Sequence, residues 1–300
     1  MTKILCIGHS AYDITLPLEE FPVENRKYGV KTVLECGGGP AGNAAYLIAK
    51  WGMSCRYAGI LGNDIYGTKI REEYENIGVD LKYLIMDDNS TTPFSFIIAN
   101  NKNGSRTLFN HKKNNSQLQL TFDDDEPETI LVDGHELDAS IQAIKKYPNA
   151  KSILDAGSYK VANVELARIV DYLVCSEDFV RDYLGLEKFD TQESINYVFK
   201  KLEQLNKKNI IITLGEKGSL YKADGKVIHQ NTYKVNALDT TGAGDIFHGA
   251  FAYCITRGFD IVKSIKISSI TAALSVEKNG GRVSIPSIED VLNLYERGVI

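Results

Sequence analysis

The sequence has few cysteines, and their spacing excludes several classes of protein. The five cysteines stand at positions 6, 36, 55, 175 and 254, and no pair of them is separated by just two residues. An odd number of widely spaced cysteines argues against a disulfide framework and against a zinc ribbon. We therefore expect free thiols in the reducing environment of the cytoplasm.

Long hydrophobic runs and an excess of positive charge are absent as well. The apolar run at the N-terminus ends at Gly8, which is too short for a signal peptide, and no later run has the length of a membrane span. The 34 Lys and Arg residues are outnumbered by 39 Asp and Glu residues, which leaves a net charge of −5. Because such a chain is poorly suited to nucleic acid phosphates, we expect neither a nucleic acid nor a membrane as partner.

The composition that remains is that of a globular protein. The chain has 300 residues, of which 43% are hydrophobic and 24% charged, enough for one large α/β core or two modest domains. Short apolar runs predict buried strands at residues 4–7, 129–132, 152–154, 172–175 and 210–214. Helical patterns lie between most of them, at residues 41–51, 69–77, 165–170 and 195–205. This alternation predicts a mainly parallel sheet with helices on both faces.

Two stretches interrupt the alternation. Residues 14–35 are rich in polar residues and turn formers, with an extended pattern at 29–34, and residues 92–110 have a hairpin signature around Asn103-Gly104. We interpret both as a small antiparallel β insert that serves as a lid or a dimer surface, with decorative surface hairpins as the alternative. The predicted division is an α/β domain of residues 1–13, 36–90 and 112–300 and a β lid of residues 14–35 and 91–111.

Two glycine-rich segments have the wrong context for known phosphate loops. Residues 62–69 approach a P-loop, but Thr68-Lys69 reverses the order of Lys and Thr that this loop requires, so we expect a turn at a helix start. Residues 37–43 have the glycine spacing of a dinucleotide site, but they do not directly follow the first strand. Consecutive glycines let the backbone approach a small ligand, and Asn43 offers it an amide. A tight strand-to-helix turn is the alternative.

A third glycine-rich segment, residues 239–251, combines an anion site with a base. The run Gly242-Ala243-Gly244 precedes an apolar helical pattern and could leave backbone N–H groups free at a helix N-terminus. Asp245 stands at the same place, where a carboxylate can take a proton from an alcohol. Phosphoryl transfer needs both an anion site and an oriented nucleophile. An aspartate that merely caps an ordinary helix is the alternative.

Together these segments resemble the two signatures of the ribokinase, or PfkB, carbohydrate kinases. Residues 37–43 match the first signature and residues 239–251 the second, and the order of the motifs fits along nearly the whole chain, nearest the ketohexokinase and sulfofructose kinase branch. The resemblance implies a doubly wound α/β sheet with a small β lid. It also implies ATP, Mg²⁺ and K⁺ as cofactors, and transfer of the γ-phosphoryl group to a sugar hydroxyl.

The resemblance assigns roles to individual residues. Asp245 matches the base, and the three residues before it, Gly242, Ala243 and Gly244, match the anion hole. Sugar contacts are implied for Asp13, Gly38, Gly39 and Asn43. Nucleotide contacts are implied for Ser176, Thr213, Leu214, Gly215, Gly218, Ala272, Ser275 and Asn279. A monovalent cation is implied among Asp239, Thr241, Ser275, Lys278, Gly280 and Ser284.

One motif departs from the family pattern. The family's N-x-x-E motif, which helps organise Mg²⁺ and phosphate, here reads Ser176-Glu177-Asp178-Phe179. Ketohexokinase-like members depart in a similar way. We expect Glu177 to compensate for part of the missing motif.

Other residues bear on the substrate. Arg106, in a segment that resembles ketohexokinase, is implied to lie near the phosphates and the substrate, whereas a surface arginine is the alternative. Lys27 and Asn110 match sulfonate contacts of sulfofructose kinase, but His135 stands where that enzyme is expected to have arginine. Histidine is a weaker, pH-dependent anion ligand. We therefore expect phosphorylation of a primary hydroxyl on a ketose or related furanose that is fructose-like, with sulfofructose and other charged ketoses left open.

Several alternatives remain open. A nucleoside kinase or ribokinase on the same scaffold would need a slot for a base, which the lid aromatics Phe94, Phe96 and Phe109 could provide. A dehydrogenase built on residues 37–42 and a non-catalytic sugar sensor are weaker hypotheses. The other histidines, His9, His111, His229 and His248, are expected to be structural or on the surface. Family analogy also predicts a homodimer formed through the lid.

Overall fold

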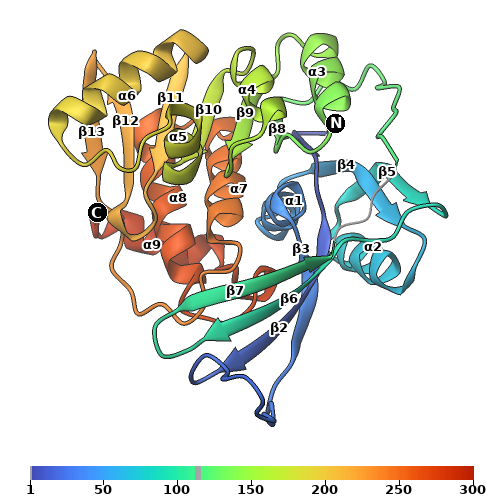
Figure 1. The fold of residues 1–300 in the computed structure, drawn as a ribbon. Coiled ribbons are helices and arrows are strands. Elements are labelled where there is room, and N and C mark those ends of the chain that lie inside the picture. Colours follow the sequence, from blue (N-terminus) through green and yellow to red (C-terminus); the bar gives the residue numbers. More distant parts are fainter. Residues whose placement is uncertain (1, 112–115) are drawn as a thin grey trace.

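The computed structural model describes residues 2–111 and 116–300, which form two sheets (Figure 1). The larger has nine strands in the order β13-β12-β11-β10-β9-β8-β1-β4-β5. Neighbouring strands from β5 to β11 are parallel, and β12 and β13 continue the sheet as antiparallel strands. The strands are β1 (Ile4–Ile7), β4 (Cys55–Gly62), β5 (Asp80–Asp87), β8 (Thr129–Val132), β9 (Lys151–Ala156), β10 (Tyr172–Ser176), β11 (Asn209–Thr213), β12 (Ser219–Ala223) and β13 (Lys226–Gln230).

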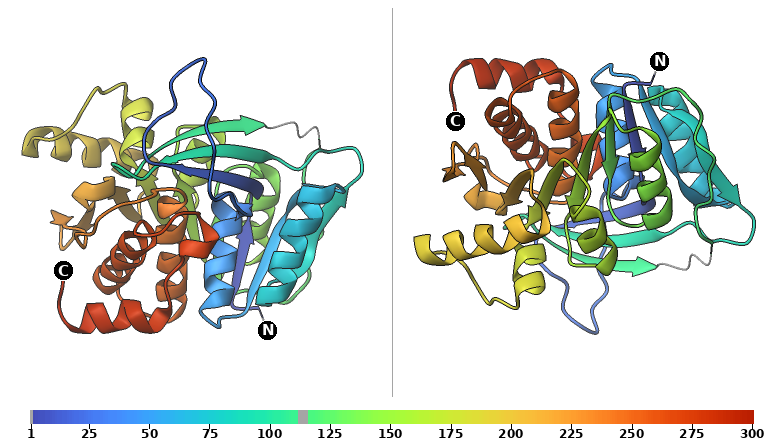
Figure 2. Two further views of the ribbon diagram at one scale, coloured as in Figure 1. Left: turned by 90° about the horizontal axis from the view of Figure 1, so that it is seen from below. Right: turned by 90° about the horizontal axis from the view of Figure 1, so that it is seen from above.

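Helices cover both faces of this sheet (Figure 2). One layer holds α1 (Pro40–Lys50), α2 (Ile65–Ile77), α7 (Ala243–Thr256), α8 (Ile261–Ser275) and α9 (Ile288–Glu296), and the other holds α3 (Leu137–Lys146), α4 (Val161–Ala167), α5 (Glu177–Leu184) and α6 (Gln192–Leu205). Side chains of a strand alternate between faces, and in β1 Ile4 and Cys6 enter one core while Leu5 and Ile7 enter the other. The predicted doubly wound α/β fold is thereby confirmed.

The second sheet forms the lid. Its order is β3-β2-β6-β7, from β2 (Ala11–Leu18), β3 (Leu34–Gly38), β6 (Phe94–Asn100) and β7 (Ser105–His111). The predicted hairpin is the antiparallel β6–β7 pair, and Gly104 at its turn has a φ of 71°, which favours glycine. The central pair β2–β6 is parallel, so the expectation of a wholly antiparallel insert is wrong. The long crossover between β2 and β6 makes this parallel pairing possible.

The lid strands do not follow the predicted boundaries. β2 begins at Ala11 and β3 ends at Gly38, where the two pair in register, so both strands reach beyond residues 14 and 35. The extended pattern expected at 29–34 yields strand only from Leu34. The upper boundary at 111/112 adjoins residues 112–115, outside the described part. The division into two domains stays a prediction.

The described helices include none with both the length and the apolar character that crossing a membrane requires.

Candidate active site

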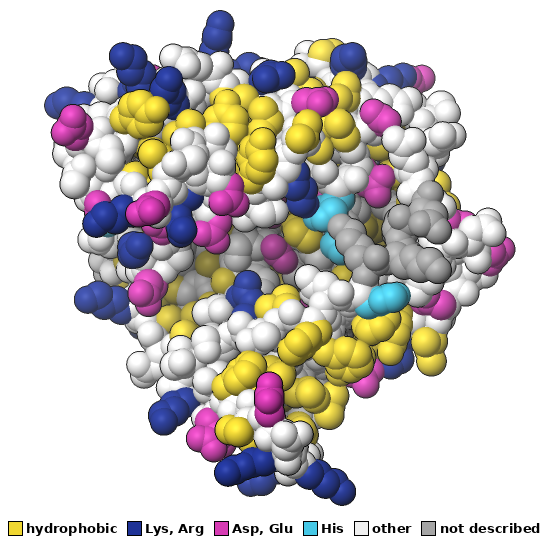
Figure 3. All heavy atoms as spheres, in the orientation of Figure 1, with side chains coloured by type: hydrophobic (Ala, Val, Ile, Leu, Met, Phe, Trp, Pro, Cys, Tyr) yellow, Lys and Arg dark blue, Asp and Glu magenta, His cyan; other side chains and the backbone are white. Residues whose placement is uncertain are grey.

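A cavity of about 410 Å³ lies between the lid and the carboxyl ends of the parallel strands. The face shown in Figure 3 is hollowed here, and basic, acidic and histidine side chains gather around the hollow. Many of the predicted site residues line this cavity: Asp13, Gly39, Asn43, Arg106, Asn110, His135, Ser176, Thr213, Thr241, Gly242, Gly244 and Asp245. The structure thus brings the two glycine-rich signatures and the lid to one place.

Asp245 is the third residue of α7 and faces the cavity. The helix is capped by Gly242, which has a φ of 73°, so the interpretation of Asp245 as an ordinary helix cap is wrong. Its Oδ2 accepts a hydrogen bond of 2.8 Å from Asn43 Nδ2. Burial and the nearby negative charge of Asp155 raise the pKa of Asp245 to about 7, against the opposing effects of Asn43, His248 and Arg106. A carboxyl poised near neutrality suits a general base.

Backbone amides surround the same helix start. Ala243 N–H donates to the Thr240 carbonyl oxygen over 3.3 Å, whereas within the described residues no protein acceptor receives the N–H groups of Gly242 and Gly244. These two donors lie at the N-terminus of a 14-residue helix, where the helix dipole adds to the attraction for an anion.

His248 lies one turn beyond Gly244 and joins α7 to the sheet. Its Nδ1 is 2.6 Å from the Gly244 carbonyl oxygen and 3.2 Å from Asp155 Oδ2, while Nε2 is 3.2 Å from the Val174 carbonyl oxygen. Both ring nitrogens therefore face oxygen atoms of the protein. His248 also lines the cavity, a position that the sequence analysis, which expected a structural or surface residue, did not predict.

Asp155 was also missed. It stands near the end of β9, lines the cavity and is buried, and burial raises its pKa while His248 opposes this effect. The available signal was its position one residue after the predicted strand at 152–154, because ligands of parallel sheets bind at the carboxyl ends of strands.

The lid contributes a row of polar groups to the cavity. Asp13 of β2, Ser95 of β6 and Asn110 of β7 are neighbours in register across the sheet, and all three line the cavity. Burial raises the pKa of Asp13 to about 6, although Ser95, Arg282 and Arg106 act in the opposite direction. Gly38 is not part of the lining; a β-carbon there would lie 2.0 Å from Asp13 Oδ2, so this glycine leaves room for the carboxylate.

Arg106 connects the lid to the segment before α7. Its guanidinium donates to the backbone oxygen of Thr240 and, over 2.8 Å, to the Thr240 hydroxyl. Because Arg106 also lines the cavity, it holds a positive charge close to Asp245.

His135 lines the cavity as predicted. It stacks on His9 with ring centroids 4.6 Å apart, and its Nδ1 is 3.1 Å from Asp133 Oδ1. Lys160 Nζ lies 3.0 Å from His135 Nε2. His9 and His111 line the cavity as well. By contrast, Lys27 is exposed on the segment between β2 and β3 and is not among the described residues that line the cavity.

The predicted nucleotide residues divide into two groups. Ser176 and Thr213 line the cavity, whereas Gly215, Gly218, Ala272, Ser275 and Asn279 lie outside its lining. Ser176 caps α5, accepting from Phe179 N–H over 2.9 Å. Glu177 turns away, because it pairs with Lys217 at 3.4 Å and lines a different cavity of about 340 Å³. Its position gives no support to the expected compensation for the altered N-x-x-E motif.

The segments predicted to hold a monovalent cation lie side by side. Asp239 accepts from Thr241 N–H over 2.9 Å and from Gly280 N–H over 2.8 Å. The hydroxyls of Ser275 and Ser284 donate within their own segments. Thr241 Oγ1 is buried without a hydrogen-bond partner. Among the described residues there is no cluster of three or more His, Cys, Asp or Glu that could hold a metal ion.

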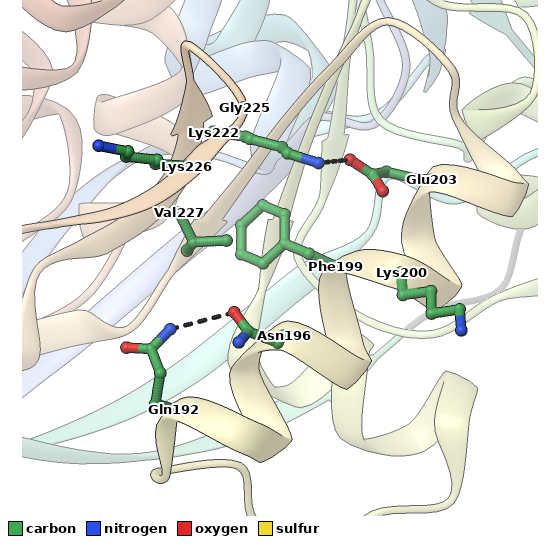
Figure 4. A pocket seen from close by; sticks show the side chains of 9 residues that line it. All are labelled: Gln192, Asn196, Phe199, Lys200, Glu203, Lys222, Gly225, Lys226 and Val227. Carbon is green, nitrogen blue, oxygen red and sulfur yellow. Dashed lines mark hydrogen bonds and ion pairs between the residues drawn. The ribbon is translucent and has the colours of Figure 1, made fainter.

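A larger hollow of about 540 Å³ lies elsewhere, between α6 and the β12–β13 hairpin (Figure 4). Phe199 and Val227 lie toward each other across it, and Lys222 pairs with Glu203 at its edge. None of the predicted site residues lines it. Convergent polar groups, and not volume, therefore distinguish the cavity around Asp245.

Comparison with known proteins places this geometry in a family context. The profile of the pfkB family carbohydrate kinases matches residues 1–288. A nucleoside kinase of Methanocaldococcus jannaschii is 23% identical over 99% of this chain and 98% of its own length. A ribokinase of Staphylococcus aureus is 25% identical over 96% of this chain and 98% of its own length. The solved structure of Arabidopsis thaliana ribokinase complexed with ribose and ATP is 26% identical and has a TM-score of 0.83, covering 98% of this chain and 99% of that one.

Proposed function

The chain belongs to the pfkB family of carbohydrate kinases, and we propose that it transfers the γ-phosphoryl group of ATP to a primary hydroxyl of a ketose or related furanose sugar. The observation that carries this proposal is the start of α7. There a carboxyl with a pKa of about 7 lies beside two backbone N–H groups without protein acceptors among the described residues, in a cavity between the lid and the larger sheet. Such a site supplies both a base for the hydroxyl and donors for the phosphoryl oxygens.

Each part of the cavity has a role in this reaction. Asp245 takes the proton of the attacking hydroxyl, and the amides of Gly242 and Gly244 stabilise the charge on the transferring group. Asp13, Asn43 and Asn110 orient the sugar through its hydroxyls. The nucleotide lies toward Ser176 and Thr213 and extends to Gly215, Gly218, Ala272, Ser275 and Asn279.

Two cations accompany ATP in this proposal. Asp155 Oδ2 is buried and makes no hydrogen bond in the described chain, although His248 Nδ1 lies 3.2 Å away. This carboxylate fits the oxygen preference of Mg²⁺ and would hold the ion near the phosphates. The bound ion would neutralise phosphate charge. The orphaned Thr241 Oγ1 and the adjoining segments around Asp239, Lys278, Gly280 and Ser284 fit a K⁺ ion.

The substrate class is argued from the lining of the cavity. Phe94 lines it, but Phe96 and Phe109 belong to the outer lid face, with 43% and 57% of their surfaces exposed. The expected aromatic slot for a nucleobase is thus reduced to one ring. Arg106 and His135 add groups that can bear positive charge, which suits a ketose with or without an anionic substituent. Ribose or a nucleoside is the second candidate, because a nucleoside kinase and a ribokinase match nearly the whole chain.

The test is ADP release with Mg²⁺ across fructose, sulfofructose, ribose, inosine, adenosine and cytidine, each in K⁺ and in Na⁺ salts. We expect the highest kcat/KM with a ketose, higher rates in K⁺, and a loss of roughly 10²–10⁴-fold in Asp245→Asn, since this change removes the base. An Asp245→Asn enzyme with full activity would refute the mechanism. A preference for ribose or a nucleoside would replace the ketose by the second candidate.

The outer face of the lid supports a homodimer. Phe96 and Phe109 are partners in register on β6 and β7 and are both exposed. Phe21, Val23 and Val33, in the segment between β2 and β3, are also at least half exposed. Exposed apolar side chains on one small sheet and on the segment between two of its strands favour a protein interface. We propose that a second copy of the chain covers this face.

A further inference from the structure

Arg282 is buried behind the active site, where its guanidinium is enclosed by polar partners and aromatic rings. It begins the short 3-10 helix η2 (Arg282–Ser284), and 1% of its surface is exposed. Nη1 donates to Glu73 over 2.9 Å and Nη2 donates to the Tyr74 hydroxyl over 2.8 Å. The guanidinium carbon lies 4.6 Å from the ring centre of Tyr74 and 5.4 Å from that of Tyr46.

Nη2 also donates to the Ser10 hydroxyl over 3.3 Å and to the Gly38 carbonyl oxygen over 3.4 Å. A further donor, Nε, connects Arg282 to the base. It donates over 3.2 Å to Asn43 Oδ1, and the other end of the same amide, Nδ2, donates over 2.8 Å to Asp245 Oδ2. Arginine has donors only, so it can contact the amide only at its oxygen. A reversed amide would set two donors against each other and its oxygen against a carboxylate. The guanidinium therefore determines which end of Asn43 meets Asp245.

We propose that Arg282 is a positioning residue for phosphoryl transfer, which fixes the Asn43 amide so that Asp245 Oδ2 is held and Oδ1 is left for the substrate hydroxyl. This inference rests on the proposed role of Asp245 as the base. No described group donates to Asp245 Oδ1. A carboxylate with one oxygen anchored and the other free meets the substrate hydroxyl in a single orientation. Such fixed orientation of the reacting groups lowers the activation barrier.

The glycine-rich segment is shaped around this guanidinium. A β-carbon at Gly37 would lie 2.0 Å from Nη1, and one at Gly42 would lie 2.8 Å from Nη2. Gly37 N–H also donates over 2.9 Å to the Glu73 carboxylate that pairs with Arg282. Two of the glycines expected to admit a ligand thus make room for Arg282, which supports α1 and β3 from behind.

The effect on Asp245 can be separated from a purely structural one. Asp155, His248 and Arg106 are the charged or titratable groups that face Asp245, and Glu73, Tyr74, Tyr46, Cys36 and Asp13 face Arg282. Loss of Arg282 frees the Asn43 amide to turn, which weakens a hydrogen bond that lowers the pKa of Asp245. The acid limb of the pH profile therefore moves to higher pH, whereas a simple loss of folded enzyme lowers all rates equally.

The experiment is a double-mutant cycle between Arg282→Met and Asn43→Ala, with kcat/KM measured from pH 5 to 9. In the chain with Asn43 we expect Arg282→Met to lower kcat/KM roughly 10- to 100-fold and to raise the pH of the acid limb. In the Asn43→Ala background the same change should cost little, because the amide through which Arg282 acts is gone. Tyr74→Phe, which removes another contact of the same guanidinium, should cost much less.

Equal losses from Arg282→Met in both backgrounds, with an unmoved acid limb, would overturn the inference. If Arg282→Met does not fold, Arg282→Lys in the same cycle gives the same decision, because it keeps the charge but not the fork of donors. The proposed function fails separately: Asp245→Asn would then retain activity, whatever the outcome at Arg282.

Discussion

Single residues in the cavity act through the charges of their neighbours. Asp245 has a pKa of about 7, raised by burial and then by the charge of Asp155. As a base it must be ionised, so kcat/KM should rise with pH through about 7 and be lost below it. The direction is opposite to that of an acid catalyst, whose activity would fall over the same range.

Replacing Asp155 tests this dependence. In Asp155→Asn the negative neighbour that raises the pKa of Asp245 is removed, which favours the ionised base. We expect the acid limb of kcat/KM to move to lower pH, even though the maximal rate falls if Asp155 holds Mg²⁺. The measurement is a pH profile at saturating MgATP, with Glu177→Gln as a control for a carboxylate that faces another cavity. An acid limb that stays in place or moves upward would contradict the electrostatic account.

At the scale of helices and strands, another aspartate, Asp133, joins three elements next to the cavity. The buried Asp133 follows β8, and its carboxylate accepts N–H groups of His9 after β1 over 2.8 Å, Ala41 in the first turn of α1 over 3.1 Å and His135 over 3.0 Å. Burial alone would raise its pKa, but His135 and these donors outweigh burial and hold the pKa below the usual range. One side chain thus joins the ends of two neighbouring strands to the start of a helix.

Removal of this carboxylate should loosen all three elements. Asp133→Ala leaves several buried donors unpaired, so we expect a loss of about 2–4 kcal/mol in the free energy of unfolding. A lowered folded-state pKa contributes stability that is present above the unfolded pKa of about 4 and is lost as pH falls below it. Urea unfolding at pH 7 and at about pH 3, below the unfolded pKa, measures both effects. In Asp133→Asn the free energy of unfolding should depend less on pH than in the wild type. An unchanged pH dependence would mean that other groups cause the acid sensitivity.

The sequence predicts those strands and turns that a local pattern of residues determines. The buried runs of β1 and β8 coincide with the predicted 4–7 and 129–132, and the Asn103-Gly104 turn identifies the β6–β7 hairpin. β2 was obscured because Ala11 and Tyr12 precede the predicted start of the lid at residue 14, and its partner Gly37-Gly38 reads as a loop. The roles of Asp133, Asp155 and Arg282 depend on contacts with residues far away in sequence, which periodicity does not encode.

At the scale of the whole molecule, the lid should determine the oligomeric state. The double substitution Phe96→Ser with Phe109→Ser removes two exposed rings from its outer face, so we expect a shift from dimer to monomer. Sedimentation velocity measures the shift. Val161→Ser on α4 changes an apolar residue with 67% exposure away from the lid and should leave the dimer intact. A wild-type chain that is monomeric at every concentration would refute the proposed interface.

The hydrogen bonds between Arg106 and Thr240 link the position of the lid to the charge of the cavity. Arg106 belongs to the lid but is anchored on the segment before α7, so any outward swing of β7 withdraws a cation from the cavity. The negative charges of Asp13, Asp155 and Asp245, which line the cavity, are then less compensated by positive charge. The cavity repels a polyphosphate in that state and accepts it when Arg106 is in place. The electrostatic attraction of the cavity for the nucleotide's phosphates thus depends on where β7 lies.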